Sequence, residues 1–175
     1  MEKEGKRRIY LVGFMGVGKS TLGRQLAQHL GYRFLDIDKL FEHKYKISIH
    51  RFFEKYDEAL FRKLGHELLE ETFSLENVVV STGGGTPCYF DAMDKMNAHG
   101  VTVYLEMDQE SLFRRLTRAR RKRPLVTNLS ENALRDTISD KLTERLPYYS
   151  RAMMTHDAGN ADIAALALAI QKDSL

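Results

Sequence analysis

The chain has 175 residues, of which 43% are hydrophobic and 29% are charged, and its formal net charge is +3. These values are typical of a soluble globular protein with one well-buried domain, and the small net charge does not by itself indicate a nucleic-acid partner. No stretch approaches the ~20 apolar residues of a membrane span, and the charged start MEKEGKRR precedes no signal-peptide core, so we expect no membrane partner. Because the single cysteine, Cys88, excludes an internal disulfide, we predict a cytoplasmic protein.

A glycine-rich loop follows the first predicted strand, an apolar run at 9–13. The stretch GFMGVGKST (residues 13–21) fits G-x-x-x-x-G-K-[ST], and leucines at four-residue spacing after it predict a helix. In such a loop backbone N–H groups surround phosphate oxygens, Lys19 adds a positive charge, and Ser20 offers a hydroxyl to Mg²⁺. The alternative is a glycine-rich turn that fits the pattern by chance. We predict a nucleoside triphosphate site formed by Gly13, Gly16, Val17, Gly18, Lys19, Ser20 and Thr21.

Two acidic residues, Asp36 and Asp38, close the second predicted strand at 33–36. Side chains two residues apart in an extended chain point to the same side, and open α/β sheets bind ligands beyond the carboxyl ends of their strands. We therefore expect Asp36 to help hold Mg²⁺ and Asp38 to receive an acceptor hydroxyl. The alternative is a pair of turn-forming residues, or a cap for a helix that begins at Lys39.

The long segment at 39–76 lies between the second and third predicted strands and has no strand pattern of its own. Ser48 can cap a helix that carries Phe52 and Phe53, and apolar residues recur at helical spacing from Leu60 onwards. We predict a helical insertion that covers one side of the site and carries the second substrate.

Three consecutive glycines, Gly83, Gly84 and Gly85, follow the third predicted strand at 77–81. They allow a ligand to approach the backbone closely and to bind free N–H groups, whereas the alternative is a plain flexible turn. Apolar runs at 101–105 and, more weakly, near 152–154 predict two further strands, and an alanine-rich tail helix is expected at 162–171. Strands that alternate with helices predict a three-layer α/β/α fold around a five-stranded parallel sheet.

The run RRLTRARRKR (residues 114–123) has seven Lys or Arg among its ten residues. We expect its first part to continue a helix after Asp108 and its last part, ending in Arg123, to belong to a mobile lid at about 116–128. Such a lid could close over ATP and exclude water. A nucleic-acid-binding patch is the alternative, but the run contains no aromatic residue that could stack on bases.

Taken together, these motifs resemble those of the shikimate kinases, a family of P-loop kinases related in architecture to nucleoside monophosphate kinases. The resemblance covers roughly residues 8–150. Its motifs are, in order, the phosphate loop, the D-x-D of FLDID, Phe61-Arg62, the glycine triplet, Arg123-Pro124-Leu125, and Arg145 before Pro147-Tyr148. The resemblance implies the strand order 2-3-1-4-5 in a single P-loop kinase domain over residues 1–175.

The same resemblance implies an activity and partners. The reaction would be phosphoryl transfer from ATP to the 3-hydroxyl of shikimate, in the biosynthesis of chorismate and the aromatic amino acids, with Mg²⁺ as cofactor. The partners would be shikimate and ATP, with no nucleic acid and no membrane, and the protein would act as a monomer.

The resemblance also implies roles for single residues. The catalytic residues would be Lys19, Asp38 and Arg123, and Arg123 would reach from the lid to the transferred phosphate while Arg115 would lie against the adenine. Arg62 and Arg145 would hold the carboxylate of shikimate. The substrate-binding set would be Asp38, Arg62, Gly83, Gly84, Gly85 and Arg145, and the metal-binding set Ser20 and Asp36.

The chemistry of the two arginines agrees with this assignment, because a planar guanidinium pairs bidentately with a carboxylate. From the residues alone, however, an i,i+4 pair between Arg62 and Glu58 on a helix surface is the favoured interpretation. No carboxylate stands four residues before Arg145, which favours an external anion there. The family commonly has an acidic residue three positions after the first arginine, where this chain has Gly65.

Two other functions remain as alternatives to a shikimate kinase. One is a kinase of the same architecture that acts on another small acceptor, such as gluconate or a nucleotide, and the two arginines with the glycine triplet argue against a nucleotide. The other is a nucleotide-binding protein that has lost catalysis. The intact Lys19, Ser20, Asp38 and Arg123 argue against it, whereas Gly65 keeps this alternative open. The six histidines show no metal-ligand spacing.

Overall fold

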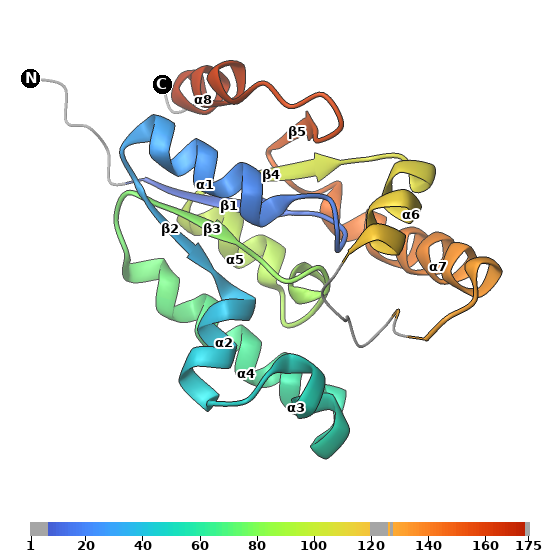
Figure 1. The fold of residues 1–175 in the computed structure, drawn as a ribbon. Helices are drawn as coiled ribbons and strands as arrows, with labels where there is room; N and C mark the ends of the chain where they lie inside the picture. Colours follow the sequence, from blue (N-terminus) through green and yellow to red (C-terminus); the bar gives the residue numbers. More distant parts are fainter. Residues whose placement is uncertain (1–6, 120–125, 127, 174–175) are drawn as a thin grey trace, which may run out of the picture.

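The computed structural model describes residues 7–119, 126 and 128–173, and a parallel β-sheet forms its centre (Figure 1). Its strands follow the order β2-β3-β1-β4-β5, and each neighbouring pair is parallel. The strands are β1 (Arg8–Val12), β2 (Arg33–Asp36), β3 (Val78–Ser81), β4 (Val101–Glu106) and β5 (Met154–Asp157). The predicted fold class and strand order are therefore confirmed.

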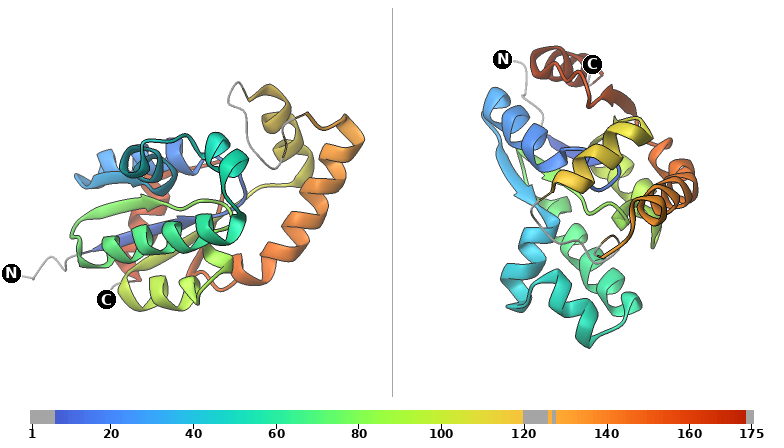
Figure 2. Two further views of the ribbon diagram at one scale, coloured as in Figure 1. Left: turned by 90° about the horizontal axis from the view of Figure 1, so that it is seen from below. Right: turned by 45° about the vertical axis from the view of Figure 1, so that its right-hand side comes forward.

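Helices cover both faces of this sheet (Figures 1 and 2). One face carries α1 (Lys19–Leu30) and α8 (Ile163–Lys172), which pack against each other. The other face carries α4 (Glu58–Glu71), α5 (Ala92–His99) and α7 (Glu131–Tyr149). The remaining helices are α2 (Ile37–Tyr45), α3 (Ile49–Lys55), α6 (Gln109–Arg118) and two short 3₁₀ turns, η1 (Thr72–Ser74) and η2 (Thr86–Cys88).

Burial on both faces explains why the central strands are apolar throughout. In β1 every residue from Ile9 to Val12 is fully buried, and the three valines of β3 are fully buried as well. Continuous apolar runs of this kind are typical of a parallel sheet covered on both sides. The first four predicted strands are accordingly confirmed to within one residue at each end.

The fifth strand begins two residues later than the predicted segment near 152–154. Its sequence, MTHD, is largely polar, and its residues alternate between half-buried and exposed because it forms the edge of the sheet. Because these residues are largely polar, an apolar run does not mark the position of the strand.

The chain beyond β2 differs from the expected extended segment. The strand ends at Asp36, which is the N-cap of α2, and its carboxylate accepts a hydrogen bond from the Lys39 N–H at 3.2 Å. Asp38 therefore lies in the first turn of α2, where a negative charge is favoured by the helix dipole. The prediction that both carboxylates extend from one strand was wrong, and the alternative of a helix cap is correct for Asp36.

An aromatic cluster holds α2, α3 and α4 together. The ring of Phe41 lies 5.0 Å from those of Phe52 and Phe61, and Phe53 lies 4.8 Å from Phe61. Ser48 caps α3 as predicted, by accepting a hydrogen bond from the Arg51 N–H. The segment is thus helical as expected.

The second half of α4 packs into the core. Leu68 and Leu69 are buried there, so the part that stands away from the sheet is shorter than the predicted 39–76. The assignment of this part to a second substrate stays a prediction.

The first part of the basic run forms a helix. Asp108 caps α6 as expected, and the helix ends at Arg118. Most of the predicted lid at about 116–128, including Arg123, lies outside the described residues.

We expect opposite effects on stability from two glycine-to-alanine substitutions. A Cβ on Gly100, which joins α5 to β4, would overlap the backbone carbonyl of Arg8, so Gly100→Ala should lower the free energy of unfolding by about 1–3 kcal/mol. A Cβ on Gly65, inside α4, would meet no atom within 4 Å, so Gly65→Ala should raise it by about 0.5–1 kcal/mol. Urea denaturation followed by circular dichroism measures both, and shifts of equal sign would contradict the different packing at the two glycines.

Candidate functional site

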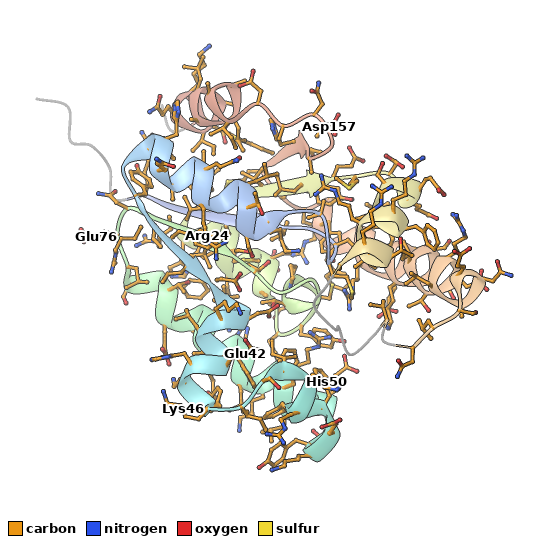
Figure 3. All side chains as sticks on the ribbon, viewed as in Figure 1. Arg24, Glu42, Lys46, His50, Glu76 and Asp157 are labelled. Atoms are coloured by element: carbon orange, nitrogen blue, oxygen red, sulfur yellow. The ribbon has the colours of Figure 1, made fainter. Side chains whose placement is uncertain are left out.

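A pocket of about 600 Å³ opens at the carboxyl ends of β1, β2 and β3. The phosphate loop and the start of α1 line one side, and the glycine triplet and α4 line another. Glu42 on α2 and His50 on α3 line the side formed by the insertion (Figure 3). A pocket in this position is where an open α/β sheet binds its ligands.

Only glycine fits the start of the phosphate loop. Gly13 has a φ of 148°, and a Cβ on it would lie 2.7 Å from the carbonyl oxygen of Leu105 in β4. Gly18 has a φ of 102° and is the N-cap of α1. The loop is therefore held close against the sheet while α1 directs its N-terminus at the pocket.

Lys19 secures the loop from within. Its side chain is 8% exposed, and its ammonium group donates hydrogen bonds to the carbonyl oxygens of Gly13 and Phe14 at 2.7 and 2.9 Å. The residue also lines the pocket, so its charge stands beside the N-terminal end of α1. An anion in the loop would meet both the lysine and the helix dipole.

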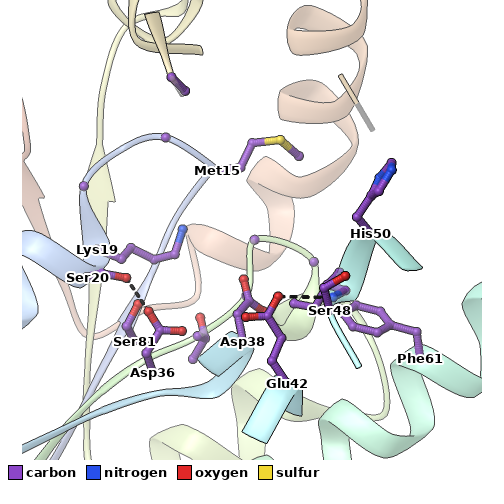
Figure 4. A pocket seen from close by; sticks show the side chains of 18 of the residues that line it. Met15, Lys19, Ser20, Asp36, Asp38, Glu42, Ser48, His50, Phe61 and Ser81 are labelled. Carbon is purple, nitrogen blue, oxygen red and sulfur yellow. Dashed lines mark hydrogen bonds between the residues drawn. The ribbon is translucent and has the colours of Figure 1, made fainter. Parts of the chain in front are cut away.

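Ser20 and Asp36 come together at the edge of the pocket nearest β2 (Figure 4). The Ser20 hydroxyl donates to the Asp36 carboxylate at 2.5 Å. A hydroxyl and a carboxylate are hard oxygen ligands of the kind that Mg²⁺ takes from a protein, together with phosphates and water. The two residues therefore fit the ion that was expected to bind to them.

Asp38 lies against the glycine triplet. A Cβ on Gly83 would lie 3.0 Å from its Oδ1 atom, so any side chain at that position would crowd the carboxylate. In Figure 4 Asp38 lies between Lys19 and Ser20 of the core and Glu42 of the insertion. This is the position from which it could meet both an acceptor and a phosphate.

Arg62 reaches the same pocket from α4 but is also paired within its helix. Its Nε and Nη2 atoms donate to Oε1 of Glu58 at 3.2 and 2.9 Å, so the i,i+4 pair weighed from the sequence is present. Burial opposes ionisation of Glu58, but the hydrogen bonds from Arg62 and Tyr89 outweigh it, and the pKa of this carboxyl lies below its ordinary value. Although it is paired with Glu58, Arg62 still lines the pocket.

Arg145 reaches the pocket from α7 in a very different setting. The residue is 4% exposed, and its Nη1 atom is buried without a hydrogen-bond partner. A Cβ on Gly84 would lie 3.1 Å from that atom. Buried polar groups are nearly always hydrogen-bonded, so an unpaired guanidinium nitrogen at a pocket points to an anion that completes it.

The glycine triplet is itself tied to α7. The hydroxyl of Tyr149 donates to the Gly84 carbonyl oxygen at 2.5 Å. Burial raises the pKa of Tyr149 above its ordinary value, so the hydroxyl keeps its proton and remains a donor. Tyr149 was not predicted from the sequence, although its place four residues after Arg145 puts both on one face of a helix.

Two residues expected at the nucleotide have other contacts. Val17 is fully buried, and its carbonyl oxygen accepts a hydrogen bond from Arg115 at 3.3 Å. Arg115 thus lies over the phosphate loop and lines the pocket. Gly16, Gly18 and Thr21 line it too, and their binding of the nucleotide stays a prediction.

Other lining residues were not predicted individually as site residues. Ser48, His50 and Phe53 come from α3 and the turn before it, and only the packing of the insertion brings them to the site. Glu42, by contrast, stands four residues after Asp38 on the same helix and could have been found from that spacing. Its carboxylate accepts from the Ile49 N–H at 3.2 Å and so links α2 to α3.

Neither a metal cluster held by protein ligands alone nor a membrane-spanning helix occurs in the described part of the chain. No group of three or more His, Cys, Asp or Glu among those residues could hold a metal ion. Over the same residues, no helix combines the length and the apolar character required to cross a membrane.

Comparison with known proteins decides the family. A family model for shikimate kinase matches residues 15–173. A shikimate kinase of Phocaeicola vulgatus is 44% identical over 145 residues, which are 83% of each chain. The chain belongs to the shikimate kinase family.

Solved structures of shikimate kinases agree with this assignment. The structure from Bacteroides thetaiotaomicron has a TM-score of 0.88 at 37% identity and covers 96% of this chain and 98% of its own. A shikimate kinase from Acinetobacter baumannii in complex with shikimate has a TM-score of 0.86 at 35% identity and covers 98% of this chain and 94% of its own. The resemblance found in the sequence is confirmed.

Cys88 provides a test of the electrostatics of this shikimate kinase site. Burial raises the pKa of its thiol to about 11, although Arg145 and Arg62 oppose the shift. Because it is the single cysteine of the chain, alkylation by iodoacetamide reports on it alone. We expect the rate to rise about tenfold per pH unit up to about pH 10, since only the thiolate reacts. The urea-unfolded protein is the control, and a plateau near pH 8.5 in the folded protein would contradict the burial of the thiol.

Proposed function

We propose that this protein transfers the γ-phosphoryl group of ATP to the 3-hydroxyl of shikimate and so acts in the biosynthesis of the aromatic amino acids. The single observation that carries the choice of acceptor is the buried Nη1 atom of Arg145, which has no hydrogen-bond partner and lies at the pocket. An acceptor with a carboxylate would complete its hydrogen bonding. Membership of the shikimate kinase family supports the same acceptor.

ATP binds at the phosphate loop in this proposal. Lys19 and the N-terminus of α1 face its phosphates, and Arg115 lies beside the adenine on the other side of the loop. Arg123, outside the described residues, is proposed to neutralise the transferred phosphoryl group. These positive charges are the main catalytic contribution, because the transition state of phosphoryl transfer is loose and needs little activation of the nucleophile.

Shikimate binds between the two arginines. Arg145 and Arg62 hold its carboxylate, and the backbone of Gly83, Gly84 and Gly85 approaches the ring. Asp38, next to Gly83, orients the 3-hydroxyl and accepts its proton late in the reaction. A carboxylate is too weak a base to remove that proton in the ground state.

Ser20 and Asp36 are the proposed protein ligands of Mg²⁺, directly or through water. Both offer oxygen atoms to the same point of the pocket, which suits this ion. When bound, Mg²⁺ supplies positive charge that neutralises the phosphates.

The monomeric state, the absence of a nucleic-acid partner and the cytoplasmic location stay predictions. Two described basic residues of α6 have a place in this proposal or in the fold: Arg115 lies at the proposed nucleotide site, and Arg114 forms an ion pair with Glu110.

The first experiment is a coupled ADP-release assay with Mg-ATP and four acceptors: shikimate, quinate, gluconate and a nucleoside monophosphate. We expect turnover with shikimate and a loss of at least about a hundredfold in Asp38→Asn, because the acceptor loses its orienting base. Turnover confined to another acceptor would identify a different kinase. ATP binding without any turnover would favour the nucleotide-binding protein that lacks catalysis.

Arg145→Met should raise the KM for shikimate about ten- to a hundredfold, because it removes charge-assisted hydrogen bonds worth about 1.5–3 kcal/mol. Methionine keeps most of the apolar packing, so the fold should persist. The matched control is Arg151→Met, which removes an exposed arginine that pairs with Asp94 on the surface. An unchanged KM in Arg145→Met would show that no acceptor carboxylate binds there.

Asp36→Asn should raise the Mg²⁺ concentration for half-maximal activity about tenfold, because the site loses a negative charge. Asparagine also caps helices well, so α2 should remain intact. Asp94→Asn, at an exposed position on α5, is the control. A Mg²⁺ dependence identical to that of the unaltered protein would remove Asp36 from the metal site.

A further inference from the structure

The guanidinium of Arg62 lies between a carboxylate and the glycine triplet. Its Nε and Nη2 atoms share one oxygen of Glu58, and a Cβ on Gly85 would overlap Nη1, Cζ and Nη2 of the same group. The side chain of Arg62 is 9% exposed, and that of Glu58 is 52% exposed. Glu58 therefore holds the Nε and Nη2 atoms from the solvent side, while the guanidinium lies against Gly85 and the residue lines the pocket.

Tyr89 contacts both members of this pair from another element. It follows η2, directly after the glycine triplet, and its ring centroid lies 4.7 Å from the Cζ atom of Arg62. Its hydroxyl donates to the same Glu58 oxygen at 3.3 Å. The tyrosine thus covers one face of the guanidinium and also restrains the carboxylate that holds it.

The next turn of α4 adds no restraint of its own. Gly65, three residues after Arg62, has no side chain. His66, four residues after it, contacts Glu70 and Lys95 instead. Among the described residues, the polar partners of the Arg62 side chain are therefore Glu58 and the ring of Tyr89, with the ring of Phe61 beside them.

We propose that Tyr89 and Glu58 are positioning residues that hold the Arg62 guanidinium in the orientation in which it binds the acceptor carboxylate. The inference rests on the proposed function, since it assumes that Arg62 binds that carboxylate. A long arginine side chain loses rotamer freedom when it binds, and a restraint present before binding reduces this loss. This restraint on Arg62 raises the affinity for the acceptor and leaves the affinity of the phosphate loop for ATP unchanged.

The test compares kinetic constants for shikimate and for ATP. Tyr89→Leu should raise the KM for shikimate about fivefold, because it removes the cation–π contact and the hydrogen bond. Tyr89→Phe, which keeps the ring, should raise it about twofold. The kcat value and the KM for ATP should stay within about twofold of those of the unaltered protein. Glu58→Gln should act like Tyr89→Leu, and Glu67→Gln, an exposed glutamate on the same helix, is the matched control.

A double-mutant cycle separates positioning from a general structural role. In an Arg62→Met background, Tyr89→Leu should change kcat/KM for shikimate by less than about 1.5-fold, because the group that it positions is gone. An equal loss in both backgrounds would overturn the proposal, and so would a KM for ATP that rises as much as that for shikimate. If Tyr89→Leu fails to fold, the cycle of Tyr89→Phe with Glu58→Gln decides. Their combined effect should be smaller than the product of the two single effects.

The outcomes also distinguish the positioning role from the proposed function. An unaltered protein that does not phosphorylate shikimate would overturn the proposed function. An unaltered protein that does so, together with an unchanged KM in Tyr89→Leu and Glu58→Gln, would overturn the positioning role alone.

Discussion

Strand β1 is the element on which the whole site depends, because it pairs with both β3 and β4 and is buried on both faces. Its carboxyl end leads into the phosphate loop, and the backbone of that loop approaches β4 so closely at Gly13 that a side chain could not fit. Parallel pairing brings the carboxyl ends of β2 and β3 to the same edge. The pairing of the strands alone therefore brings the acidic residues and the glycine triplet to the phosphate loop.

The two arginines illustrate two ways to present a cation to a small anion. Arg145 is buried on α7, lies 5.7 Å from the ring of Phe14, and has one nitrogen unpaired. Arg62 is held on α4 by a partner that water can reach. Buried charges interact strongly, and exposed pairs contribute little to stability. In the proposed function, the first arginine would supply affinity for the acceptor, and the second would depend on the neighbours that fix its direction.

Much of this arrangement could be predicted from the sequence because the signals are local. The phosphate loop, the glycine triplet and four strands each occupy one continuous stretch, and the periodicity around them is clear. The setting of Asp38 was misjudged because the capping of α2 by Asp36 begins the helix two residues earlier than the strand pattern indicates. The edge strand β5 was displaced because polar residues on its exposed side interrupt the apolar run.

The remaining contacts could not be predicted because they join distant parts of the chain. Tyr89 and Glu58 are 31 residues apart, and no pattern in either segment indicates that they meet. His50 reaches the pocket only because the aromatic cluster around Phe41 folds α3 onto α2. The sequence thus predicted the residues at the phosphate-loop end of the pocket better than those that the insertion brings to it.

The unpaired nitrogen of Arg145 sets stability against function at this position of the protein. A buried cation with an unfilled hydrogen bond destabilises the folded state, and replacing it by an apolar residue of similar volume is often neutral or stabilising. A search for thermostable variants would therefore tend to select substitutions at this position that impair function. In the proposed function a bound acceptor carboxylate would offset this cost, so the acceptor would also stabilise the fold, with the logarithm of its concentration once the site is nearly saturated.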